Sequence, residues 1–146
     1  MAEVLVIYGT ESGNSEMAAD DIAISLGALG LDAEVKSMED VLIAELASAS
    51  QLVVITSTYG EGELPETTAP FFNALQAERP DLSGTRFSAF GLGDSTYTKF
   101  NNAVDIIVAK LSEFGAVQIG ETGRHDAASG KSVTLAANAW VAQVYN

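Results

Sequence analysis

The stretch Val4-Leu5-Val6-Ile7-Tyr8-Gly9-Thr10-Glu11-Ser12-Gly13-Asn14-Ser15 joins an apolar run to a turn that is rich in hydroxyl groups. The apolar run predicts a buried strand, and the spacing of apolar residues after the turn predicts a helix. Such a turn presents backbone N–H groups beside a helix N-terminus, where phosphate is a common ligand. Residues 10–15 include no Lys or Arg. We therefore expect hydroxyl groups, amides and the helix dipole to hold one phosphate group.

Strand-like and helix-like segments alternate along the rest of the chain. The expected strands are residues 4–8, 32–36, 51–56, 86–91 and 117–119, and the expected helices are residues 14–29, 38–47, 68–77, 101–114 and 132–145. This alternation is typical of a parallel sheet covered by helices on both faces, and right-handed crossovers make it doubly wound. No linker or repeat interrupts it. The sequence therefore predicts one α/β domain over residues 1–146, a three-layer sandwich around a five-stranded sheet.

Apolar residues recur at roughly helical spacing in the first helix, at Met17, Ala18, Ile22, Ile24, Leu26 and Leu29. In the last helix the same kind of spacing predicts a core face made of Leu135, Trp140, Val141 and Val144. Residues 120–131 are polar and are expected to form a connector.

Charge and composition set limits on partners. Seven Lys and Arg residues against 20 Asp and Glu give a net charge of −13 at pH 7, which argues against binding to nucleic acid or anionic lipid and favours a basic protein partner. The lack of cysteine excludes disulfides and thiolate chemistry. His125 is the only histidine, so a structural or solvent-facing role suits it better than metal binding. With no basic leader and no apolar run of roughly 20 residues, we expect a soluble, cytoplasmic protein.

Three loops follow the first, third and fourth expected strands. They are the phosphate turn (residues 10–15), the second loop (residues 57–65) and the third loop (residues 91–100). Ligands of doubly wound sheets bind beyond the carboxyl ends of the strands, where the strand order reverses. Tyr59 and Tyr97 can stack on the two faces of a flat ring, although each could instead close an edge of the core. Together with a phosphate site, the two tyrosines favour flavin mononucleotide (FMN).

Other nucleotide-binding motifs are incomplete. Neither Gly60-Glu61-Gly62 nor Gly91-Leu92-Gly93 has the third glycine of a dinucleotide fingerprint. The sequence Gly130-Lys131-Ser132 ends like a Walker A motif, but His125 stands in place of its first glycine. A response-regulator receiver needs acidic residues at the end of its first strand, where this chain has Gly9-Thr10-Glu11-Ser12.

The three loops together resemble the FMN-binding loops of the flavodoxins and of the FMN domains of diflavin reductases. The matching stretches are Thr10-Glu-Ser-Gly-Asn-Ser15, Ser57-Thr-Tyr-Gly-Glu-Gly-Glu-Leu-Pro65, Gly91-Leu-Gly-Asp-Ser-Thr-Tyr97 and Phe100-Asn101. Each follows the appropriate strand, and the similarity covers nearly the whole chain. The resemblance implies a flavodoxin-like fold with strand order 2-1-3-4-5, and FMN as the cofactor.

The resemblance also implies roles for individual residues. The implied FMN-binding residues are Thr10, Glu11, Ser12, Gly13, Asn14, Ser15, Ser57, Thr58, Tyr59, Gly60, Gly62, Leu92, Gly93, Asp94, Tyr97, Phe100, Asn101 and Asp126. Residues 10–15 would bind the phosphate, while Tyr97 would stack parallel to the ring with Tyr59 on its other face. Gly60 would let a peptide carbonyl turn toward flavin N5. Asp126 matches an acidic position in related FMN domains. No catalytic or metal-binding residue is expected.

These expectations describe an electron carrier rather than a stand-alone enzyme. Full reduction places negative charge on the ring, which Glu61, Glu63, Asp94 and the overall charge oppose. We therefore expect a monomeric, low-potential one-electron carrier between a basic reductase of the flavodoxin or ferredoxin type and acceptor proteins. Two alternatives stay open. One is an FMN-dependent NAD(P)H:quinone oxidoreductase, for which 146 residues leave little room. The other is the FMN domain of a diflavin reductase, and the start at Met1 and the end soon after the last helix favour a free-standing protein instead.

Overall fold

The computed structural model describes residues 4–9, 14–58, 64, 67–93 and 102–145. Its elements in chain order are β1 (Val4–Gly9), α1 (Asn14–Ala28), β2 (Ala33–Ser37), α2 (Ile43–Ser48), β3 (Gln51–Ser57), α3 (Thr68–Glu78), β4 (Arg86–Gly93), α4 (Asn102–Glu113), β5 (Val117–Gln118), β6 (Gly123–Asp126), a short 3₁₀ helix η1 (Ala127–Ser129) and α5 (Val133–Tyr145). Every helix and strand expected from the sequence is present, with ends that differ by a few residues.

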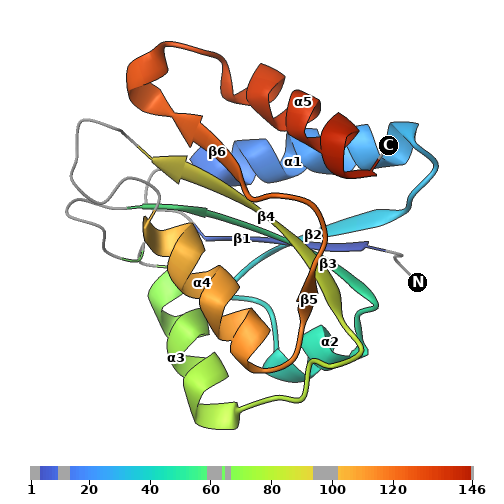
Figure 1. The fold of residues 1–146 in the computed structure, drawn as a ribbon, viewed down its shortest axis with the longest axis vertical. Coiled ribbons are helices and arrows are strands. Elements are labelled where there is room, and N and C mark those ends of the chain that lie inside the picture. The colour runs from blue at the N-terminus through green and yellow to red at the C-terminus, as the bar shows by residue number, and fades with distance from the viewer. Residues whose placement is uncertain (1–3, 10–13, 59–63, 65–66, 94–101, 146) are drawn as a thin grey trace.

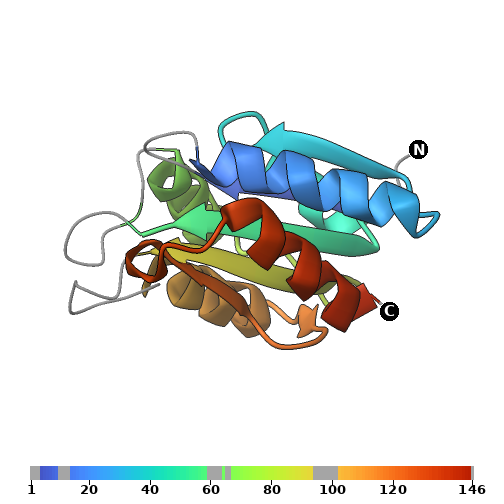
Figure 2. The same cartoon turned by 90° about the horizontal axis from the view of Figure 1, so that it is seen from above.

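The sheet is parallel throughout, with the order β2-β1-β3-β4-β5 (Figure 1). This confirms the predicted strand order. Helices α1 and α5 lie side by side on one face, and α2, α3 and α4 cover the other (Figures 1 and 2). β3 runs between the two layers, and its residues from Leu52 to Ile55 are completely buried. Its unbroken β-branched run predicts this central position.

One correction concerns the expected connector at residues 120–131. Within it, Gly123–Asp126 forms a further strand, β6, that pairs with the last part of β4, whereas β5 pairs with the first part. The fifth position in the sheet is therefore shared by two short strands. Between them, the carbonyl of Glu121 accepts a hydrogen bond from Trp140 Nε1 at 3.0 Å. The sequence of β6 has no apolar pattern that would predict a strand, because β6 lies at the edge of the sheet, where polar residues are tolerated.

The predicted core face of the last helix is partly wrong, and several apolar residues of the first helix are exposed as well. Met17, Ile24, Leu29 and Leu135 have exposed fractions of 50%, 72%, 48% and 70%. The buried face of α1 is formed instead by Ala18, Ala19, Ile22 and Leu26, which recur every three or four residues. Trp140 and Val141 are buried as predicted, and Val144 is half-buried. A helix that packs on a sheet buries only one stripe of its surface, so apolar residues outside that stripe stay exposed.

Candidate functional site

The carboxyl ends of four strands (β1, β3, β4 and β6) lie at the same end of the sheet. Gly9 pairs with Thr56, and Ser57 pairs with Leu92. β6 ends there too because Gly93 pairs with Asp126. The three loops therefore leave the sheet from neighbouring positions, next to the reversal of strand order between β1 and β3.

The described residues include only part of the expected FMN site. Ser15, Ser57, Thr58, Leu92, Gly93 and Asp126 are described in full, and Asn14 is described as the first residue of α1. The other expected site residues lie outside the described residues: Thr10, Glu11, Ser12, Gly13, Tyr59, Gly60, Gly62, Asp94, Tyr97, Phe100 and Asn101. Glu61 and Glu63 lie outside them too.

Ser15 lies in the first turn of α1, next to the phosphate turn. Its side chain is completely buried, and within the described part of the chain its Oγ has no hydrogen-bond partner. An unpaired buried hydroxyl costs about 1–3 kcal/mol. The first N–H groups of a helix also lack acceptors within that helix. This end of α1 therefore holds several donors suited to an anion.

Thr58 connects the second loop to both ends of the third. Its N–H donates to the carbonyl of Leu92 at 2.9 Å, which continues the pairing of β3 with β4 by one residue. Its Oγ1 accepts a hydrogen bond from the N–H of Ala103 at 3.0 Å, in the first turn of α4. The hydroxyl oxygen of this expected FMN ligand thus has a partner in the protein.

Thr56 and Thr68 form a buried pair that sequence reasoning missed. Their Oγ1 atoms lie 2.8 Å apart, and both side chains are completely buried. Thr56 is the second-last residue of β3, before the second loop, and Thr68 is the first residue of α3, after it. Gly9 lies against Thr68, and a Cβ on this glycine would overlap the threonine side chain. The only signal in the sequence is a threonine on each side of the loop.

Leu92 and Gly93 belong to β4, not to the third loop as expected. Leu92 pairs with Ser57 on one side and with His125 on the other, and its side chain is buried in the layer of α1 and α5. β4 continues two residues beyond the predicted end because strands flank it on both sides.

Asp126 and His125 organise the end of β6. Asp126 Oδ1 accepts a hydrogen bond from the N–H of Ala128 at 3.0 Å and so caps η1. The buried His125 ring places Nε2 at 2.7 Å from the carbonyl oxygen of Lys131, so Nε2 carries the proton and donates it. His125 therefore has the structural role that the sequence predicts. The role of Asp126 toward FMN stays a prediction.

The sequence model of the flavodoxins matches residues 6–140 of this chain. The chain belongs to the flavodoxin family. A flavodoxin of Maridesulfovibrio salexigens is 40% identical over 129 residues, which cover 86% of this chain and 87% of that protein. Protein MioC of Escherichia coli K12 is 38% identical over 122 residues, covering 84% of this chain and 82% of that protein.

Two further comparisons refine this relationship. The structure of oxidised Flavodoxin 2 from Bacillus cereus has a TM-score of 0.88 and 30% identity, covering 99% of this chain and 98% of that one. NADPH-dependent diflavin oxidoreductase 1 of Emericella nidulans is 34% identical over 125 residues, 84% of this chain but only 19% of that protein. The similarity to the flavodoxins thus extends over almost their whole length.

Flavodoxins bind FMN, and the described residues fit its phosphate end. The unpaired Ser15 hydroxyl and the N-terminus of α1 supply donors at the edge where β1, β3 and β4 end. Among the described residues, no group of three or more acidic, histidine or cysteine side chains is placed to hold a metal ion. The described helices include none long and apolar enough to cross a membrane.

Negatively charged side chains also lie near the carboxyl end of β1. Burial raises the pKa of the Tyr8 hydroxyl, and the carboxylates of Glu16, Asp20 and Asp40 raise it further, Glu16 partly through a hydrogen bond. These groups come from α1 and from the segment after β2. Negative potential therefore reaches Tyr8, two residues before the phosphate turn.

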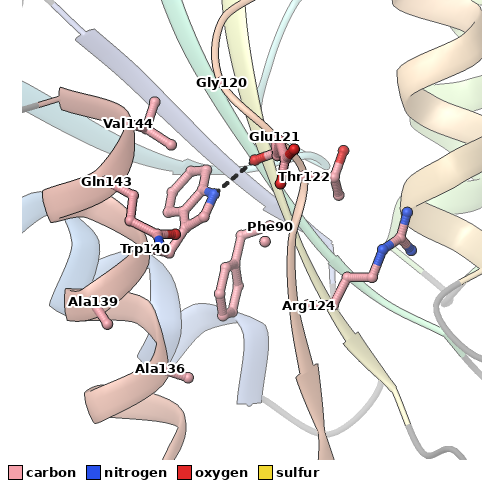
Figure 3. Close-up of a pocket in the computed structure, with 11 residues that line it drawn as sticks. Phe90, Gly120, Glu121, Thr122, Arg124, Ala136, Ala139, Trp140, Gln143 and Val144 are labelled. Carbon is pink, nitrogen blue, oxygen red and sulfur yellow. Dashed lines mark hydrogen bonds between the residues drawn. The ribbon is translucent and has the colours of Figure 1, made fainter.

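A cavity of about 580 Å³ lies elsewhere, at the edge of the sheet between α5 and β6 (Figure 3). Its lining includes Phe90, Trp140, Val144 and residues 120–124, and none of the expected FMN ligands. Phe90 and Gly123 precede the ends of their strands by three residues, about 10 Å along a strand. The cavity is thus distinct from the carboxyl ends of the strands, from which the cofactor loops leave the sheet.

Proposed function

We propose that this flavodoxin is a low-potential one-electron carrier with no substrate chemistry of its own. FMN, when bound, supplies the one-electron redox chemistry. The observation that carries the proposal is the buried Ser15 hydroxyl, unpaired among the described residues, at the N-terminus of α1. It lies next to the carboxyl ends of the strands, where this fold binds its ligand.

The chain's own residues would divide the work of binding. Ser15, the N–H groups of α1 and the rest of the phosphate turn would hold the phosphate without any basic side chain. Tyr59 and Tyr97 would enclose the ring and exclude water from its faces. Asp126 would stay near the ring through its position at the end of β6. These assignments rest on the resemblance of the loops and on the place where their strands end.

Negative charge would make the bound cofactor a strong reductant. The net charge is −13, and the carboxylates of Glu16, Asp20 and Asp40 act together on Tyr8 beside the phosphate turn. A negative environment disfavours the addition of electrons to a nearby group. The same charge would attract basic redox partners, a reductase as donor and acceptor proteins beyond it, most strongly at low salt. We propose a monomer that works in the cytoplasm.

The test is a redox titration of the purified protein, with and without a basic NADPH-dependent flavodoxin reductase. We expect a yellow protein that releases one FMN on denaturation and takes up electrons from NADPH only through the reductase. The rate of reduction should fall as the salt concentration rises. A colourless protein that fails to bind added FMN would overturn the proposal.

A second candidate, the FMN domain of a larger reductase, is supported by the 34% identity to a diflavin oxidoreductase. An immunoblot of source cells with an antibody to this chain separates the two. A band near 15.2 kDa indicates a separate carrier, and a band several times larger indicates a diflavin reductase. Steady quinone reduction with NADPH by the protein alone would favour the oxidoreductase alternative.

A further inference from the structure

We propose that Thr68 and Thr58 are positioning residues that hold the stems of the three cofactor loops in place before FMN binds, Thr68 through its side chain and Thr58 through its side chain and its backbone N–H. The inference rests on the proposed function because it gives these hydroxyl groups a task in FMN binding.

The first contact closes the second loop. Thr56 Oγ1 donates to the carbonyl oxygen of Ser57 at 3.1 Å, which uses the single proton of that hydroxyl. The Thr68 hydroxyl lies 2.8 Å from Thr56 Oγ1 and forms a hydrogen bond with it. The chain of bonds runs from Thr68 to Thr56 to Ser57 and fixes the carbonyl at the start of the loop. The N-terminus of α3 thereby fixes the position of the carboxyl end of β3.

The second contact joins the second loop to the phosphate turn. Thr68 also lies against Gly9, the last residue of β1, so closely that only a hydrogen fits between them. Gly9 directly precedes the phosphate turn, and Thr68 directly follows the segment that holds the second loop. The separation of these two stems is therefore set by contact and cannot decrease.

The third contact joins the second loop to the third. The third loop runs between β4 and α4, and Thr58 bonds to both of these elements, to the carbonyl of Leu92 and to the N–H of Ala103. Thr58 also directly precedes Tyr59. Its two hydrogen bonds therefore fix where the chain enters the segment that carries this ring-flanking residue.

These contacts order the stems of the three loops when the protein folds, before FMN binds. A preformed site binds more tightly than a loose one because less conformational freedom is lost on binding. Removal of one hydroxyl should weaken FMN binding by about fivefold to tenfold, the effect of one typical hydrogen bond.

The test compares Thr68→Val and Thr58→Val with Thr85→Val as a matched control. Thr85 is buried like Thr68, and its hydroxyl shares its one proton between the carbonyls of Leu46 and Ala49, at 2.9 and 3.2 Å, next to the amino end of β4. For each variant we would measure urea unfolding without FMN, the FMN dissociation constant and the midpoint potentials of the two one-electron steps.

We expect Thr85→Val to lose stability while it keeps the wild-type dissociation constant and potentials. Thr68→Val and Thr58→Val should bind FMN about fivefold to tenfold more weakly and shift the potentials, and Thr68→Ser and Thr58→Ser should restore both. Thr58 is only half-buried, so its variants keep the test available if Thr68→Val does not fold.

Wild-type binding and potentials in folded Thr68→Val and Thr58→Val would overturn this inference and leave the proposed function intact. Failure of the wild-type protein to bind FMN would overturn both. An equal loss of affinity in Thr85→Val would also contradict the inference, because it would show that any buried hydroxyl has the same effect.

Discussion

Gly9 and Thr68 are in direct contact, with the α-carbon of the glycine facing the side chain of the threonine. A Cβ on Gly9 would overlap the Thr68 hydroxyl and would lie 2.8 Å from the sulfur of Met38. The backbone of β1 therefore reaches the N-terminus of α3 only because position 9 has no side chain. This contact lies one residue before the phosphate turn.

We expect Gly9→Ala to destabilise the protein by about 1–3 kcal/mol or more, because the added methyl group overlaps atoms on two sides. Urea unfolding measures the change. Gly27→Ala is the matched control, since a Cβ at that site in α1 has no described atom within 4 Å apart from its chain neighbours and the backbone of its own helix. That substitution should stabilise the helix by about 0.5–1 kcal/mol. Equal effects of the two substitutions would contradict the contact.

Ser15→Ala should weaken FMN binding without destabilising the FMN-free protein. Removal of a buried hydroxyl that lacks a partner among the described residues should leave the FMN-free protein as stable as before, or more stable by about 1 kcal/mol. FMN binding should weaken. The measurements are urea unfolding in phosphate-free buffer and an FMN titration.

Ser88→Ala is the control for this prediction. Its buried hydroxyl lies 2.7 Å from the Tyr145 hydroxyl, so its loss should destabilise the protein by about 1–3 kcal/mol without a change in FMN affinity. A loss of stability in Ser15→Ala equal to that in Ser88→Ala would show that the Ser15 hydroxyl is satisfied without a ligand.

Tyr145 should make stability depend on pH in the alkaline range. Burial raises the pKa of Tyr145 above its ordinary value of 10.0, while the hydrogen bond to Ser88 partly opposes this rise. A raised pKa means that the unfolded chain loses the proton first, so stability is retained below pH 10.0 and falls as pH increases beyond it. Tyr145→Phe should make that fall shallower in urea unfolding measured between pH 9 and about 11. An unchanged slope would contradict the assignment.

Glu45 should contribute in the acid range. The backbone N–H of Leu42 lowers the pKa of the Glu45 carboxyl below its ordinary value of 4.5, and Lys36, 2.8 Å away, lowers it further. A lowered pKa gives stability that is present above pH 4.5 and is lost as pH falls through the folded value. Glu45→Gln should reduce the loss of stability on acidification.

Lys36→Met provides the comparison for Glu45. It removes only the second cause of the lowered pKa, so its effect on the acid unfolding profile should be smaller than that of Glu45→Gln. An effect as large as that of Glu45→Gln would show that the ion pair, not the N–H of Leu42, dominates at this site.

Local patterns in the sequence predict the elements better than their faces. The β-branched run at residues 51–56 becomes the buried β3, and the strand order follows from the family resemblance. Ile24 and Leu135 fit an apolar helical pattern yet are exposed, because the sheet, not the helix, determines which side faces the core. β6 was missed because a short edge strand carries no apolar run.

By itself, the sequence determined the class of fold, the family and FMN as cofactor, because these depend on patterns within single elements and loops. Only the tertiary structure decided the partners of hydroxyl groups. Thr56 meets Thr68 across 12 residues of chain, and Thr58 meets Ala103 across 45. Such pairs depend on the register and direction of whole elements, which no local pattern encodes. The structure also left Ser15, one more hydroxyl of the same region, buried and unpaired among the described residues, where FMN is expected to supply its partner.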